Sequence, residues 1–132
     1  GTLRAFSSEV LAKAFSRLQE IVEGGAVSLG GSGKLIRHIG YPPLINNKDS
    51  CGVALKAARA FLPVESVVYP GDRGLYGEDF AYYLQKVPGC FAMLGCRNES
   101  KGCIYPLHHP HFDLDEECMK VGVRFFFEIL NG

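Results

Sequence analysis

The sequence has no excess charge of either sign, because 14 Lys and Arg residues balance 14 Asp and Glu residues. Without a basic excess there is little to attract phosphate backbones or an anionic membrane, so we expect neither nucleic acid nor a membrane as a partner. No apolar run approaches the roughly 18 residues that a membrane span requires, and no targeting signal opens the chain. These absences favour a cytoplasmic protein.

The chain also lacks the even number of cysteines that a disulfide framework needs. Its five cysteines stand at positions 51, 90, 96, 103 and 118, and the first and last lie in helical patterns beside apolar residues. We therefore expect reduced thiols, as in a cytosolic protein. A chain of 132 residues, 47 % of them hydrophobic, is expected to bury roughly two thirds of its unfolded surface in a core.

Helical spacing of apolar residues occurs in four segments. The first begins at the capping residues Ser7 and Ser8 and should end at Gly24 and Gly25. The second follows the capping residues 47–50 and should be closed by Pro63. The third should run from Gly77 to about Val87. The fourth matches a capping box, with Asp113 at the N-cap and Glu116 three residues on, and it is apolar almost all round, which predicts a helix covered on both sides.

Strand-like runs separate these helical segments. We expect strands over residues 2–6, 26–29, 34–41, 64–69 and 90–95. Residues 30–33 (GGSG) read as a turn rather than a phosphate-binding loop, since neither the required Lys-Ser nor a helix follows them. The mixed order of helices and strands, with no internal repeat, predicts an α/β or mixed α+β fold.

Three of the four histidines fall within four residues, in Leu107-His108-His109-Pro110-His111. Imidazoles this close in a polar loop suggest a metal ligand or a general base, while the alternative is a surface loop whose histidines cap, stack or face solvent. A zinc site built from Cys96, Cys103, His108 and His111 is a weaker alternative, because its spacing fits none of the usual paired-ligand patterns.

Two acidic pairs have a structural explanation at hand. Glu78 and Asp79 lie where a helix should begin, and acids in a first turn stabilise a helix by a few tenths to about 1 kcal/mol. Glu116 and Glu117 resemble an acid pair for acid/base catalysis, but the capping box already accounts for Glu116.

The motifs GTLRAF, GYPPLINN, YGEDFAYYLQKVPGCFAMLG and LHHPHFDLDEE follow one another along the chain. In this order they resemble the C-terminal third of the aminoacylase-type metal-dependent amidohydrolases. That peptidase family includes N-acyl-amino-acid amidohydrolases, hippurate hydrolases, indole-acetyl-amino-acid hydrolases and carboxypeptidase G. The EDFAYYLQKVPG and LHHPHFD stretches are the specific parts of the resemblance, and GYPPLINN supports it.

The resemblance implies a two-domain arrangement. Residues 1–64 would be the second half of a lid domain that pairs two subunits into a homodimer, and residues 65–132 the C-terminal segment of a zinc-peptidase-like catalytic domain. The full-length enzyme would bind two divalent ions, zinc or else cobalt or manganese. Metal-activated water would then hydrolyse the amide bond of a small N-acyl amino acid or peptide.

The resemblance also assigns roles to two residues. His108 matches the family's last metal ligand, the His of a Leu-His-x-Pro motif, and Arg4 matches an arginine that approaches the substrate carboxylate. Tyr76 departs from the family, which has a small residue before Gly77. Because His109 precedes Pro110, we expect it to be extended and to face away from His108.

The family's other metal ligands and its glutamate base precede GTLRAF in its members and have no counterpart here. The resemblance therefore implies a fragment of the enzyme, with no catalytic residue of its own, unable to bind both metals fully and inactive by itself. The alternative is a non-catalytic dimerisation or interaction module derived from the same fold.

Overall fold

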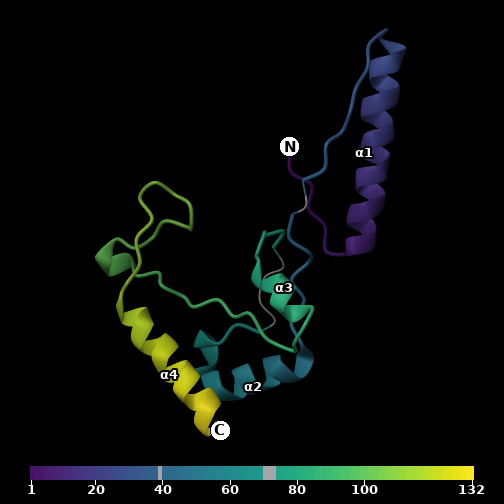
Figure 1. Ribbon diagram of the computed structural model, residues 1–132. Coiled ribbons are helices and arrows are strands. Elements are labelled where there is room, and N and C mark those ends of the chain that lie inside the picture. The colour runs from purple at the N-terminus through teal and green to yellow at the C-terminus, as the bar shows by residue number, and fades with distance from the viewer. Residues whose placement is uncertain (39, 70–73) are drawn as a thin grey trace. The chain divides into compact units, whose positions relative to one another are not determined.

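The structure is a computed structural model that describes residues 1–38, 40–69 and 74–132. Its α-helices are α1 (Ser8–Ser28), α2 (Lys48–Arg59), α3 (Phe80–Leu84) and α4 (Glu117–Asn131), with short 3-10 turns at Val64–Ser66 and Glu99–Lys101 (Figure 1). The chain divides into two compact units. The first comprises Gly1–Ile45 and Gly71–Pro88, and the second comprises Asn46–Pro70 and Gly89–Gly132.

Helix α1 begins as predicted and ends later than predicted. Ser7 is its N-cap, and the Ser7 side chain accepts a hydrogen bond from the Val10 N–H at 3.1 Å. The helix continues through Gly24 and Gly25 to Ser28, so the strand expected over residues 26–29 is wrong. A glycine costs only about 1 kcal/mol inside a helix. The chain turns instead at Gly30, whose φ is 75°.

Two hydrogen bonds at this turn form a Schellman motif, which satisfies carbonyls at the end of α1. Gly30 N–H donates to Val27 O at 3.0 Å, and Gly31 N–H donates to Ala26 O at 2.9 Å. The interpretation of residues 30–33 as a turn is thereby confirmed for its first two residues.

Helix α2 is capped by Asn47, one of the predicted capping residues 47–50. The Asn47 side chain accepts hydrogen bonds from the N–H groups of Asp49 and Ser50, both at 3.0 Å. The helix packs against α4 within the second unit. The Arg124 guanidinium of α4 lies over the Phe61 ring, 5.9 Å from its centroid.

Helix α4 starts three residues after the predicted capping box would place it. Asp113 accepts a hydrogen bond from the N–H of its neighbour Leu114 at 2.8 Å, and Glu116 at the N-cap position makes no side-chain capping bond. Asp115 supplies the acceptor instead, for Glu117 N–H at 3.3 Å. A side chain two residues before a free N–H reaches it in an Asx turn, and this local bond replaces the capping box.

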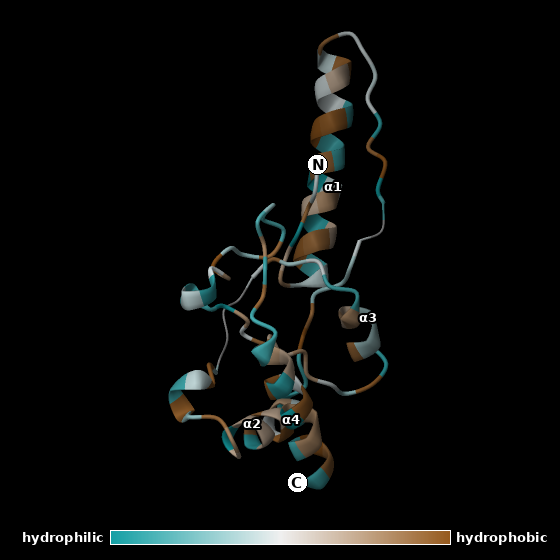
Figure 2. Cartoon of the chain, turned by 90° about the vertical axis from the view of Figure 1, so that its left-hand side faces the viewer, coloured by the Kyte–Doolittle hydropathy of each residue, from teal (hydrophilic) through white to brown (hydrophobic). Residues whose placement is uncertain are grey.

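Helix α4 is also not covered on both sides, contrary to the prediction. Its apolar residues Met119, Val123, Phe126, Phe127 and Leu130 are all more than half exposed. Figure 2 shows brown, apolar segments along α4 and also along α1. In the described part of the chain α2 is the only element that packs extensively on α4, so these side chains stay largely exposed.

The expected strands do not form in the ranges that the structure describes, so the α/β class is not confirmed. The β contact seen there is an isolated antiparallel bridge between Asn98 and Cys103. The first part of the run over residues 64–69 is a 3-10 turn, and the runs over 2–6, 34–41 and 90–95 are irregular, residue 39 lying outside the described ranges. A strand is stable only when a neighbouring strand pairs with its backbone.

The core is small for the same reason. Among the described residues, the hydrophobic side chains that are nearly fully buried are Ala57, Ala81 and Cys103. The length of the chain led us to expect burial of roughly two thirds of the unfolded surface. In the described ranges no sheet backs the helices, and many large apolar side chains stay exposed. In the described ranges, no helix combines the length and the apolarity that crossing a membrane demands.

Candidate functional site

The histidine cluster lies in two successive turns of the second unit. His109 N–H donates to Pro106 O at 3.1 Å, and Phe112 N–H donates to His109 O at 2.9 Å. His108 occupies the third position of the first turn with a φ of 68°, the only positive φ of a non-glycine residue in the described ranges. A side chain in this left-handed region costs of order 1 kcal/mol, and such residues concentrate at functional sites.

His109 and His111 belong to an aromatic stack, which matches the alternative interpretation of this loop. The His109 ring lies parallel to the Tyr105 ring, with centroids 4.2 Å apart and 9° between planes. The His111 ring is tilted against both, at 5.7 Å from Tyr105 and 5.6 Å from His109. His111 N–H also donates to His109 Nδ1 at 3.1 Å, so this nitrogen is occupied.

His108 is exposed and makes no ring contact among the described residues. We expected adjacent residues in an extended run to separate His108 from His109. The structure gives a different cause, because a turn with a left-handed His108 lies at this point rather than an extended run. His108 is thus the histidine of the cluster whose ring is not engaged in the stack.

The described residues do not assemble a metal site by themselves. No three His, Cys, Asp or Glu side chains of these ranges lie close enough together to hold one ion. The alternative set of Cys96, Cys103, His108 and His111 is therefore wrong for this structure. Cys103 is buried, with its Sγ 3.9 Å from Lys101 O.

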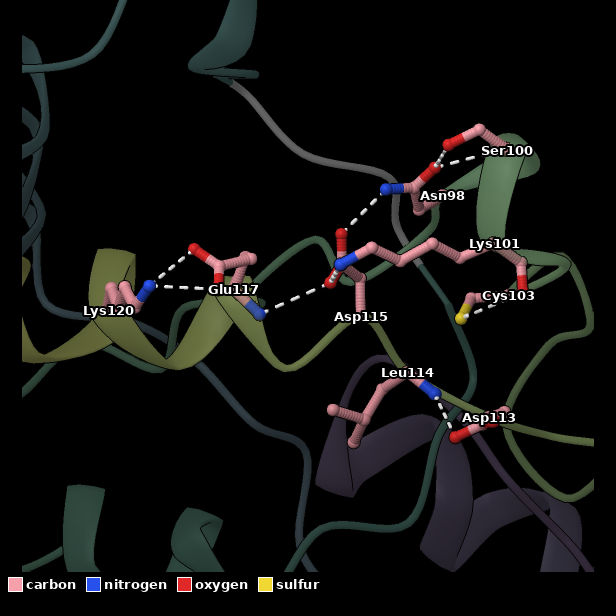
Figure 3. Close-up of polar contacts among 9 residues, drawn as sticks. All are labelled: Asn98, Ser100, Lys101, Cys103, Asp113, Leu114, Asp115, Glu117 and Lys120. Atoms are coloured by element: carbon pink, nitrogen blue, oxygen red, sulfur yellow. Dashed lines mark hydrogen bonds and ion pairs between the residues drawn. The ribbon is translucent and has the colours of Figure 1, made fainter.

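Asp115 joins the two ends of the loop that carries the histidines, in a cluster that we call the Asp115 clasp (Asn98, Lys101, Asp115 and Glu117; Figure 3). Its carboxylate accepts from Asn98 Nδ2 at 2.6 Å, Lys101 Nζ at 2.5 Å and Glu117 N–H at 3.3 Å. Its own N–H donates to Cys96 O at 3.0 Å. These hydrogen bonds therefore hold together the two ends of the segment 97–114.

The clasp has an electrostatic signature. The hydrogen bonds from Lys101 and then Asn98 hold the Asp115 carboxyl pKa down at about 2, against an ordinary 3.8. The same bond raises the pKa of the Lys101 ammonium. The Asp115 side chain is only 13 % exposed and the Lys101 side chain 52 %, so the carboxylate is the more buried member of the ion pair. Nothing in the local sequence pattern joins these two residues, so residue spacing gives no signal for the pair.

Arg4 lies in the first unit, where its Nη1 donates to Leu75 O at 2.6 Å. Its side chain is exposed. A guanidinium carries five N–H donors in a planar fork, and this bond to a backbone carbonyl uses one of its ends. The contact orients the side chain and leaves donors for an anionic group.

The acidic pairs behave as structural residues. Glu78 Oε1 accepts from Phe80 N–H at 3.1 Å, at the start of α3. Glu117 pairs with Lys120 of the same helix, at 2.7 and 2.8 Å. Tyr76, the departure from the family pattern, is 80 % exposed.

Comparison with known proteins gives consistent matches. The sequence profile of Peptidase family M20/M25/M40 matches residues 20–132. The chain is 35 % identical to "Thermostable carboxypeptidase 1" of Saccharolobus solfataricus, over 92 % of this chain and 30 % of that protein. It is 33 % identical to "N-acetyl-L-cysteine deacetylase" of Bacillus subtilis, over 97 % of this chain and 29 % of that protein.

A plant relative matches as well. The chain is 32 % identical to "IAA-amino acid hydrolase ILR1-like 6" of Arabidopsis thaliana, over 92 % of this chain and 27 % of that protein. No solved structure gives a significant match. The chain thus spans about three tenths of the length of these curated relatives.

Proposed function

Because the chain belongs to Peptidase family M20/M25/M40, we propose that it is part of a metal-dependent amidohydrolase that cleaves the amide bond of N-acyl amino acids or small peptides. The observation that carries the proposal is the match over residues 20–132 together with relatives named for carboxypeptidase, deacetylase and amino-acid-conjugate hydrolase activity. All three names describe hydrolysis of an amide bond beside an amino acid.

In such an enzyme, bound divalent ions, which we propose to be two zinc ions, supply an activated water and Lewis-acid stabilisation of the oxyanion. The described residues of this chain do not fit a complete metal site, because they bring no three ligands together. We propose that His108 contributes one imidazole, and that the other ligands and the general base come from a part of the full-length protein that lies outside these 132 residues. The exposed, left-handed His108, whose ring stands outside the Tyr105 stack, supports that role.

Arg4 is proposed to bind the substrate carboxylate. Its bond to Leu75 O holds one end of the guanidinium, and a planar fork matches the two oxygens of a carboxylate better than an ammonium does. The 132-residue chain alone is then expected to be inactive toward N-acyl amino acids.

By the same family resemblance, we assign residues 1–64 to a lid domain and residues 65–132 to the catalytic domain, in a cytoplasmic protein. The compact units divide the chain differently because each combines two separate stretches. We also propose that the lid pairs two copies of the chain. Supporting this, α1 exposes apolar side chains, with Val10 58 %, Ile21 55 % and Val27 69 % exposed.

The alternative, a dimerisation module without catalysis, rests on the same exposed face of α1. Light scattering on the chain should report a dimer or larger species under both interpretations, since exposed apolar surface drives association. A monomer at high concentration would contradict the pairing. Amide hydrolysis by the full-length protein distinguishes the two, because the module would show none.

The metal assignment is tested by comparing His108→Ala with the matched substitutions His109→Ala and His111→Ala in the full-length protein. We expect His108→Ala to lose bound metal and nearly all activity, while the other two retain both because their rings serve the Tyr105 stack. Metal content per subunit is the readout. Equal losses in all three variants would mean that the loop acts only as a folding unit, and loss confined to residue 109 or 111 would show the motif alignment to be wrong.

A further inference from the structure

Two cysteines of the second unit lie in direct contact. The Sγ atoms of Cys51 and Cys90 are 3.4 Å apart, although 39 residues separate them in the chain. Cys51 is in the first turns of α2, and Cys90 opens the irregular segment that follows Gly89. Both side chains are half-buried, and all five cysteines of the chain are free thiols.

Backbone and side-chain hydrogen bonds on either side of Cys90 hold the pair in place. Before Cys90, Gly89 O accepts from Asn47 N–H at 2.9 Å. After it, Phe91 N–H donates to Asn46 Oδ1 at 2.8 Å, and Asn46 Nδ2 donates to Phe91 O at 2.9 Å. The segment is therefore fixed against the start of α2 at the residue before Cys90 and at the residue after it. The contact between the thiols is part of this arrangement.

We propose that Cys51 and Cys90 form an oxidisable dithiol that closes to an intramolecular disulfide on reaction with a low-molecular-weight disulfide. The thiolate of one of the two cysteines attacks one sulfur of the oxidant and releases its first thiol, leaving a mixed disulfide on that cysteine. The other cysteine then loses its proton and attacks the cysteine sulfur of the mixed disulfide, which releases the second thiol. The two protein thiols lose two electrons and two protons, and the oxidant is reduced to two thiols.

The surroundings of Cys90 disfavour its thiolate. Partial burial, and then the hydrogen bond and the charge of Cys51, raise the pKa of the Cys90 thiol to about 11. The closeness of the two thiols is thus one cause of this shift. A mixed disulfide on either cysteine lies next to the other thiol, so the second step requires little movement.

The other cysteines serve as internal references. Cys103 is buried and its pKa is raised, first by burial and then by the charges of Asp113 and Asp115. Cys118 is half-buried in α4 of the same unit. Among the described residues neither makes an Sγ–Sγ hydrogen bond of the kind that joins Cys51 and Cys90, although the charge of Cys96 also contributes to the raised pKa of Cys103. Cys51 and Cys90 are therefore the pair expected to be linked.

The experiment exposes the full chain to oxidised glutathione, blocks the remaining thiols with an alkylating reagent and maps the peptides by mass spectrometry. We expect the loss of two hydrogens from the intact protein, three alkylated cysteines and a cross-linked peptide pair containing Cys51 and Cys90. A protein in which these two cysteines remain alkylated while others are oxidised, or in which another pair is linked, would overturn the proposal.

Three variants sharpen the result. Cys118→Ser is the matched control and should keep the cross-link. Cys90→Ser should stop at a stable mixed disulfide on Cys51, and Cys51→Ser at one on Cys90, because in each variant the second thiol is missing. An internal disulfide in either variant would refute the proposed pair. Loss of the cross-link in Cys118→Ser would refute it as well.

Discussion

Asn46 makes a bond pattern that normally belongs to a neighbouring strand, and its removal provides a sharp test of the structure. Its amide accepts from the Phe91 N–H at 2.8 Å and donates to the Phe91 carbonyl at 2.9 Å, across 45 residues of sequence. One side chain thus pairs with both backbone groups of a residue in the run that the sequence predicted to be a strand. We predict that Asn46→Ala destabilises the second unit.

The magnitude follows from the two bonds. An intramolecular hydrogen bond contributes about 1 kcal/mol net, so the loss of both should cost about 2 kcal/mol, and more where water cannot replace the amide. Because Asn46 is half-buried, the loss of these bonds should cost more stability than the same loss at an exposed side chain. In urea, with a slope of about 2 kcal/mol per molar, the unfolding midpoint should fall by about 1 M.

The assay is urea unfolding of the full chain, followed by the helical circular dichroism signal. Asn131→Ala is the matched control, because Asn131 is exposed and makes one hydrogen bond, to Phe127 O; its cost should stay below about 0.5 kcal/mol. If Asn46→Ala shifts the unfolding midpoint no more than this control, the two bonds to Phe91 do not contribute about 2 kcal/mol of stability.

A second substitution at the same position tests the direction of each bond. Asn46→Asp keeps an acceptor for the Phe91 N–H but places a carboxylate oxygen against the Phe91 carbonyl. We expect it to be no more stable than Asn46→Ala at pH 7. The repulsion raises the pKa of the new carboxyl above its unfolded value, so the destabilisation is present above the folded pKa and is relieved as pH falls through it. A variant whose stability does not recover in acid would contradict this geometry.

Three further predictions concern other parts of the chain. The Asp115 carboxyl pKa is lowered to about 2 from 3.8, so the clasp contributes stability that is present above about pH 4 and lost as pH falls toward 2. Between about pH 4 and 2 the free energy of unfolding should therefore fall more steeply for the native chain than for Asp115→Asn, and equal slopes would refute the clasp. Ser7→Ala removes the N-cap bond to Val10 N–H and should cost about 1 kcal/mol, measured by the same unfolding assay, with Ser7→Asp as the variant that retains the cap. Arg4→Lys in the full-length protein should raise KM for carboxylate-bearing substrates, since an ammonium cannot form two parallel bonds; unchanged kinetic constants would leave Arg4 with only its bond to Leu75.

The sequence by itself determined the features whose partners lie within a few residues. Capping residues were predicted at Ser7 and Ser8 and at residues 47–50. The observed N-caps, Ser7 and Asn47, lie among them, and each side chain bonds an N–H two or three residues ahead. The starts of α1 and α2 follow from these caps and from apolar spacing. Family membership was also predicted, from the order of four motifs, and the family comparison confirmed it.

Local patterns failed where two local choices competed. Gly24 and Gly25 were expected to end α1, but the helix continues through both and ends in the Schellman turn at Gly30. The capping box at Asp113 matched the sequence pattern, yet Asp115 forms the bond to the first turn of α4. Neither outcome is visible in spacing, because spacing does not compare the free energies of alternative turns.

Only the tertiary structure decided the contacts between distant residues. Asn46 with Phe91, Cys51 with Cys90, and Lys101 with Asp115 have no sequence signal, since 45, 39 and 14 residues separate their members. The same holds for the predicted strands, whose alternation of residue types describes one face and says nothing of a pairing partner. Secondary structure patterns encode which surface a segment can bury, whereas the free energy of pairing depends on which other segment is present to meet it.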